Sequence, residues 1–279
     1  MNRTWSIYEF VSSPMWMKAF IYIFIISVIV FTANHFIDEV RPGNFWGLTY
    51  GTIAAVLFFA VAAYGFRRRT MKTSSKMKLG RSYIWLQFHL YGGALSLLFM
   101  FMHINFQFPQ GAFNWWLWGL TVWVVLSGIV GVVLQKWIPR LMSSALTLEV
   151  RYDRIPELVA ELAEKARAEA AGASEPIQDF YNRTMAADME KPLVRPSFFI
   201  DITGGVQARI RQMDYLKQFL SPEEEDKLEK LEMLFRTKLE CDAHYTLQKP
   251  LRVWLVTHLP VSIVLLVLLL IHLFIVYYY

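Results

Sequence analysis

The chain alternates between long apolar stretches and short polar connections, and one long polar region interrupts this pattern before the end. Five stretches carry no Asp, Glu, Lys or Arg: residues 19–37, 45–66, 82–108, 111–135 and 253–279. They contain 19, 22, 27, 25 and 27 residues. Because a helix needs about 20 apolar residues to cross a bilayer, the pattern predicts an all-α membrane protein with five spans.

The polar region 138–250 lies between the fourth and fifth spans and has a helical pattern. Residues 156–171 combine helix-forming residues with apolar positions three or four apart. Ser221-Pro222 followed by three glutamates is typical of a helix start. We therefore expect three parts: spans one to four in 1–137, a helical cytoplasmic insertion in 138–250, and span five in 251–279.

Composition excludes several classes of protein. Only 18% of the residues are charged, against about a quarter in soluble domains. The single cysteine, Cys241, excludes a disulfide scaffold and a cysteine-ligated zinc or iron–sulfur site. The sequence contains no GxGxxG motif and no P-loop, which excludes a soluble enzyme built on a Gly-rich nucleotide loop.

Charge predicts the orientation in the membrane. The insertion holds 16 Lys+Arg and 20 Asp+Glu, a net charge of −4, whereas the rest of the chain carries 12 and 3, a net charge of +9. The loop 67–81 has seven basic residues and no acid, so we place it, the N-terminus and the insertion in the cytoplasm. The C-terminus then lies outside, and we expect a bacterial inner (plasma) membrane location without a cleaved signal peptide. The topological role of basic residues beside the spans explains the basic excess without nucleic acid, and membrane lipid is the expected surrounding.

Four of the six histidines fall within spans three and five, and their spacing is the same. His89 and His103 are 14 residues apart, as are His258 and His272. Fourteen residues at about 100° each return to nearly the same helix face after a rise of about 21 Å. Because both spans run from the cytoplasm outward, His89 should face His258 near the inner surface, and His103 should face His272 near the outer one.

Two facing imidazoles can supply both axial ligands of a haem iron, so the sequence predicts two b-type haems. Gly92 and Gly93 leave room for a flat macrocycle one turn after His89, and Arg81 and Arg252 are placed to meet the propionates of the inner haem. A zinc or copper site fits poorly, because residues 14 apart on one helix cannot reach one ion and each ion would have only two histidines.

A third and a fifth span that are parallel and each carry His-x13-His resemble the ferric-reductase-like transmembrane core of metal reductases and NADPH oxidases. The resemblance covers roughly 17–136 and 251–279, and it implies that His89, His103, His258 and His272 ligate two stacked haems. It also implies a flavin domain docked on the cytoplasmic loops, but the chain stops after span five and the loop before that span is replaced by the insertion. We therefore expect electrons from a partner protein or from quinol, within a larger complex.

The leading hypothesis is an electron-transfer subunit of an oxidoreductase complex, which carries electrons between a cytoplasmic or quinone partner and an outer acceptor. One alternative is a quinol-oxidising or quinone-reducing membrane anchor of a respiratory complex, with His35 and Asp38 as the titratable candidates. The other is a haem-free assembly or scaffold protein, which would be colourless.

Other candidate motifs have simpler explanations. His244 and Cys241 form too small a set for a metal site, and Ser127-Gly128 is best explained by helix packing. The segment 201–205 lacks the lysine of a phosphate loop. The acidic run 223–226 fits a helix start, with a docking surface for a soluble electron carrier as the alternative.

Overall fold

The computed structural model describes residues 14–73 and 81–278, and the elements within these ranges are helices only. The chain divides into two compact units: unit 1 comprises residues 1–132 and 255–279, and unit 2 comprises residues 133–254. Unit 2 therefore contains the whole range 138–250 of the predicted insertion and extends beyond it at both ends. Residues 74–80 of the basic loop and the N-terminal residues 1–13 lie outside the described residues.

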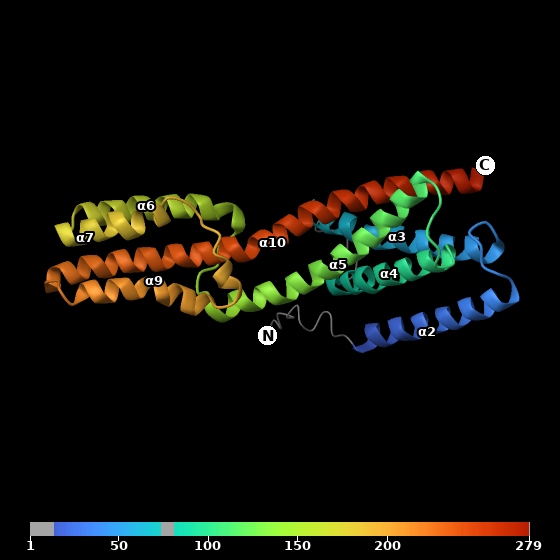
Figure 1. Ribbon diagram of the computed structural model, residues 1–279, viewed down its shortest axis with the longest axis horizontal. Coiled ribbons are helices and arrows are strands. Elements are labelled where there is room, and N and C mark those ends of the chain that lie inside the picture. Colours follow the sequence, from blue (N-terminus) through green and yellow to red (C-terminus); the bar gives the residue numbers. More distant parts are fainter. Residues whose placement is uncertain (1–13, 74–80, 279) are drawn as a thin grey trace. The chain divides into compact units, whose positions relative to one another are not determined.

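The described residues include five helices long and apolar enough to cross a membrane (Figure 1). They are α2 (Pro14–Ile37), α3 (Phe45–Thr73), α4 (Ser82–His103), α5 (Ala112–Ala145) and α10 (Pro222–Tyr278). In unit 1, α3 packs along α4, and α2 also contacts α4. The five predicted spans thus each correspond to a helix.

The helices differ from the apolar runs mostly by extension: α2 starts before residue 19 and α3 continues past residue 66, and three further differences concern the later spans. The third span was predicted to reach residue 108, but α4 ends at His103, because Asn105 and Phe106 adopt positive φ angles of 51° and 56° that stop a right-handed helix. The other two differences are extensions: α5 continues past residue 135 to Ala145, and the helix that starts at Pro222 continues without a break into span five.

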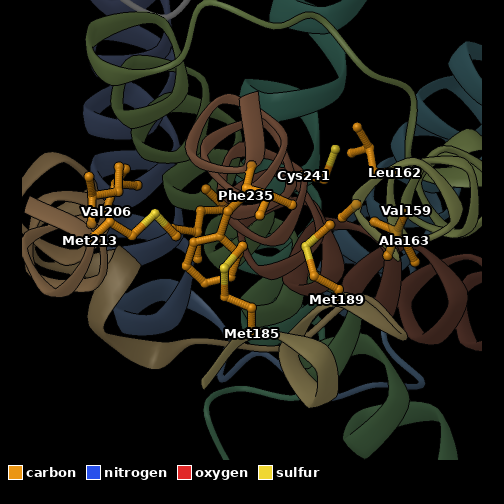
Figure 2. Packing of buried hydrophobic residues seen from close by; sticks show 14 of the residues in the cluster. Val159, Leu162, Ala163, Met185, Met189, Val206, Met213, Phe235 and Cys241 are labelled. Atoms are coloured by element: carbon orange, nitrogen blue, oxygen red, sulfur yellow. The ribbon is translucent and has the colours of Figure 1, made fainter. Parts of the chain in front are cut away.

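Unit 2 is built like a small soluble helical domain. Its further elements are η1 (Tyr152–Arg154), α6 (Ile155–Ala171), α7 (Glu175–Phe180), the π-helix η2 (Tyr181–Met185), α8 (Ala186–Met189), η3 (Pro196–Phe199) and α9 (Ile202–Lys217). Figure 1 shows the first half of α10 between α6 and α9. Figure 2 shows the core at this place: Phe235 of α10 has Met213 of α9 on one side, and Cys241 lies toward Leu162 of α6.

A buried ionic cluster fixes the last turns of unit 2 before span five. The Asp242 carboxylate accepts hydrogen bonds from Lys238 Nζ at 2.8 Å and Arg195 Nε at 2.9 Å, and neither Lys238 nor Asp242 is exposed. Arg195 also contacts Asp188 at 2.7 Å. Because an unpaired charge is very costly in a protein interior, these pairs lock the segment around Arg195 onto α10.

Candidate functional site

The outer pair of histidines lies in one large cavity of unit 1. His103 of α4 and His272 of α10 both line a cavity of about 650 Å³, and their ring centroids are 6.4 Å apart with the planes at 78°. Phe113 of α5 stacks on His272 at a centroid distance of 6.3 Å. Two imidazoles 169 residues apart in the sequence (272 − 103) thus face each other across a short gap.

The inner pair lies in a second cavity of unit 1, of about 320 Å³. His89 of α4 and His258 of α10 line it. The remaining lining is mostly aliphatic and aromatic and includes Phe20, Phe58, Val61, Val124, Leu265 and Leu266. Each helix therefore contributes one imidazole to each of two separate cavities, as the 14-residue spacing predicts.

Hydrogen bonds fix the orientation of both histidines on α4. His89 Nδ1 lies 3.0 Å from the carbonyl oxygen of Val61, and His103 Nδ1 lies 2.7 Å from that of Gly47. A carbonyl oxygen can only accept, so the proton is on Nδ1 and each Nε2 carries a lone pair. A metal-ligating histidine typically has this arrangement, with its second nitrogen donating to a carbonyl or carboxylate.

His258 is held in the same way by a side chain. Ser127 Oγ of α5 donates to the Val124 carbonyl at 3.0 Å and lies 2.8 Å from His258 Nδ1. Because the hydroxyl proton is used on Val124, the oxygen accepts from Nδ1–H, and His258 Nε2 again carries a lone pair. Ser127 is thus a functional candidate, whereas its sequence context suggested only helix packing.

The outer pair has the separation that axial ligation requires. With a metal–imidazole nitrogen bond of about 2.0 Å and about 1.2 Å from that nitrogen to the ring centre, two opposite imidazoles on one metal have centroids about 6.4 Å apart. The observed 6.4 Å agrees. Such rings can have any angle between their planes, since each plane contains the bond axis, so the centroid separation of His103 and His272 fits a bis-histidine haem.

Glycines make room beside the histidines, but not all at the predicted positions. Gly93 lines the inner cavity, and a Cβ built there meets nothing within 4 Å, whereas a Cβ on Gly92 would lie 2.8 Å from Val61 Cγ1. Gly93 therefore faces the cavity and Gly92 packs against α3. Gly51 was not predicted: a Cβ there would lie 2.7 Å from His103 Nδ1.

Neither predicted arginine is among the residues that line the cavities. Arg81 is exposed at the N-terminal cap of α4. Arg252 belongs to unit 2, where its guanidinium bonds Asp153 and lies 4.8 Å from the ring centre of Tyr152. A role of either arginine toward a propionate stays a prediction.

The quinone candidates lie at the C-terminal end of α2. His35 is exposed, stacks on Phe31 at a centroid distance of 6.1 Å, and is not among the residues that line the outer cavity. Asp38 is also outside that lining, whereas the neighbouring Glu39 belongs to it and pairs with Arg41 at 2.8 Å.

His244 and Cys241 are packed inside unit 2, where they have structural roles. His244 Nε2 donates to the Leu148 carbonyl, and its Nδ1 accepts from Gln248 Nε2 at 3.1 Å, so both ring nitrogens are engaged. Burial raises the pKa of the Cys241 thiol to about 11, which makes it unreactive. Within residues 14–73 and 81–278, no three His, Cys, Asp or Glu side chains are grouped so that they could hold a metal ion; a bis-histidine haem needs only two.

Sequence reasoning missed the contribution of α3 to the site. Gly47 supplies a carbonyl to His103, and Gly51, one turn later, provides the space for its ring. Two glycines four residues apart in an apolar run are the signal that could have indicated a close approach to this helix.

No protein-family model matches the chain, and no curated protein or solved structure is significantly similar to it.

Proposed function

We propose that the protein is a two-haem b-type cytochrome subunit that carries electrons across a membrane. His89 and His258 would hold the inner haem, and His103 and His272 the outer haem. One observation carries the proposal: α4 and α10 each contribute one imidazole to each of two cavities. In His89 and His103, one histidine of each pair, Nδ1 donates to a backbone carbonyl, so Nε2 carries the lone pair. The resemblance to the ferric-reductase-like core has the same ligand pattern.

The side chains around each pair have separable tasks. Val61, Gly47 and Ser127 orient the imidazoles, while the apolar walls of the inner cavity exclude water. A dry, apolar surrounding raises the cost of extra charge and is one of the means by which a protein sets a redox potential. When bound, haem supplies one-electron exchange at its iron.

The orientation completes the proposal. The positive charge of the basic loop 67–81 supports an orientation in which the inner cavity lies toward the cytoplasm of a bacterial plasma membrane. Electrons then pass between a cytoplasmic or quinone partner and an outer acceptor, and unit 2 is an insertion between spans four and five that docks the donor or joins a larger complex.

The experiment is to purify the chain in mild detergent, record its visible spectrum and measure haem per chain. We expect two haems in the wild-type protein and one in His103→Ala and in His272→Ala. His35→Ala is the matched control, because His35 is exposed and lies outside the outer cavity lining. A colourless wild-type protein, or two haems in both outer variants, contradicts the proposal.

A further inference from the structure

An exposed apolar stripe runs along the continuous helix α5, whose residues from 133 onward belong to unit 2. Trp123, Leu126, Val130, Val133 and Trp137 follow each other at intervals of three or four residues, and each is between 43% and 55% exposed. Positions with this spacing share one helix face. In a membrane-spanning helix, such a face is in contact with lipid.

A segment of unit 2 extends this stripe beyond its last residue. The ring of Phe199, at the end of η3, stacks on Trp137 with centroids 5.9 Å apart and planes at 25°. The next residue, Ile200, is 89% exposed, although the following Ile202 is 5% exposed. Trp137 and Phe199 are thus in contact and Ile200 directly follows Phe199 in the chain; we call these three residues the α5 edge.

Ile200 is held outward by the fold. The Ser197 carbonyl accepts the N–H groups of both Ile200 and Asp201 at 3.0 Å, which closes a tight turn. Phe198 is 1% exposed and anchors this turn in the core of unit 2. The exposure of Ile200 is thus a property of a well-anchored turn.

The depth of the α5 edge follows from its helix. Trp137 comes two residues after the apolar run 111–135, within the continuous helix α5, which corresponds to about 3 Å along the axis. Tryptophan prefers the membrane–water interface. The flanking Lys136 and Arg140 are the basic residues typical of a cytoplasmic span end.

We infer that the α5 edge is a membrane-contact surface, which seats Ile200 of unit 2 in the headgroup–acyl boundary of the cytoplasmic leaflet. Phospholipid fits better than a protein partner, because the edge continues the exposed apolar stripe of α5 and Trp137 is flanked by the basic residues Lys136 and Arg140. The contact fixes one end of unit 2 at the bilayer surface. It does not depend on haem.

The test labels Ile200→Cys with an environment-sensitive fluorophore in the full chain, reconstituted in vesicles of phosphatidylcholine and phosphatidylglycerol. Cys241 is the only native cysteine and is buried with a raised pKa, so the wild-type chain gives the background labelling. Phe219→Cys is the control, because Phe219 is 69% exposed at the turn between α9 and α10.

We expect lipids with a nitroxide near the headgroup to quench the label at 200 severalfold more than the label at 219, and aqueous iodide to show the reverse order. Equal quenching of both labels by iodide overturns the inference. Protection of the label at 200 from both quenchers also overturns it, because that outcome indicates a protein contact.

Discussion

The histidines of the two units have different hydrogen-bonding environments. In unit 2, His244 donates from one ring nitrogen to Leu148 and accepts at the other from Gln248. In unit 1, His89 and His103 each donate from Nδ1 to a carbonyl, and Nε2 carries a lone pair beside a cavity. The difference teaches that a histidine is a candidate metal ligand when the fold leaves one of its ring nitrogens with a lone pair beside a cavity.

The surroundings of the histidines differ for the same reason. Unit 2 buries an internal ionic cluster and a continuous apolar core, so its polar groups find partners within the protein. Unit 1 exposes much of its apolar surface, as expected where lipid replaces water. Ionisable side chains are rare in membrane-spanning segments, and those that occur there are usually functional.

The largest expected effect is that of Gly51→Ala on the outer histidine pair. The added Cβ would lie 2.7 Å from His103 Nδ1 and displace the ring from Gly47. We expect loss of the outer haem with the inner haem retained, measured as haem per chain and as loss of one component in a redox titration.

Gly65→Ala is the matched control for this prediction, because it lies on the same helix and its Cβ would meet nothing within 4 Å. Both substitutions gain similar helix propensity. Two haems in Gly51→Ala would contradict the assignment of the outer cavity.

A smaller effect is expected from Ser127→Ala, which removes the partner of His258 Nδ1. Loss of a group that orients a metal ligand typically lowers metal affinity by about 10–100-fold. We expect a weaker inner haem, measured by the rate of haem transfer to an apo-protein acceptor. Ser262→Ala is the control, since Ser262 lines the same cavity but its hydroxyl donates at 2.7 Å to the backbone oxygen of His258; equal haem transfer in the two variants would remove Ser127 from the site.

The smallest effect tests His244 as a structural residue. Burial lowers the pKa of His244 below its ordinary value of 6.5, with opposing contributions from the Leu148 carbonyl and from Glu240 and Glu149. The unfolded chain therefore binds the proton more readily, so this contribution to stability is present above pH 6.5 and is lost as pH falls toward the lowered pKa. We expect the unfolding temperature to fall between pH 7 and pH 5, and to fall less in His244→Gln, measured by circular dichroism in detergent.

An equal pH dependence in both proteins, or a loss of haem in His244→Gln, would contradict the contrast between the histidines of the two units.

The sequence alone determined the five spans and the faces of spans three and five that carry histidines. Both are local properties, because the length of an apolar run and the 3.6-residue period act within one helix. The same reasoning overextended the third span, since the turn at Asn105 and Phe106 contains no charged residue that would have ended the run.

Only the tertiary structure decided which nitrogen of each imidazole is engaged, and by what. Ser127, Gly47 and Gly51 reach the histidines from α5 and α3, and the Leu148 carbonyl, 96 residues away in the sequence, binds His244. These partners lie on other segments, and the helical period of one segment carries no information about which residues of another segment pack against it. The exposure of Ile200 has the same origin, because the turn that presents it is anchored by Phe198 in a core assembled from several helices.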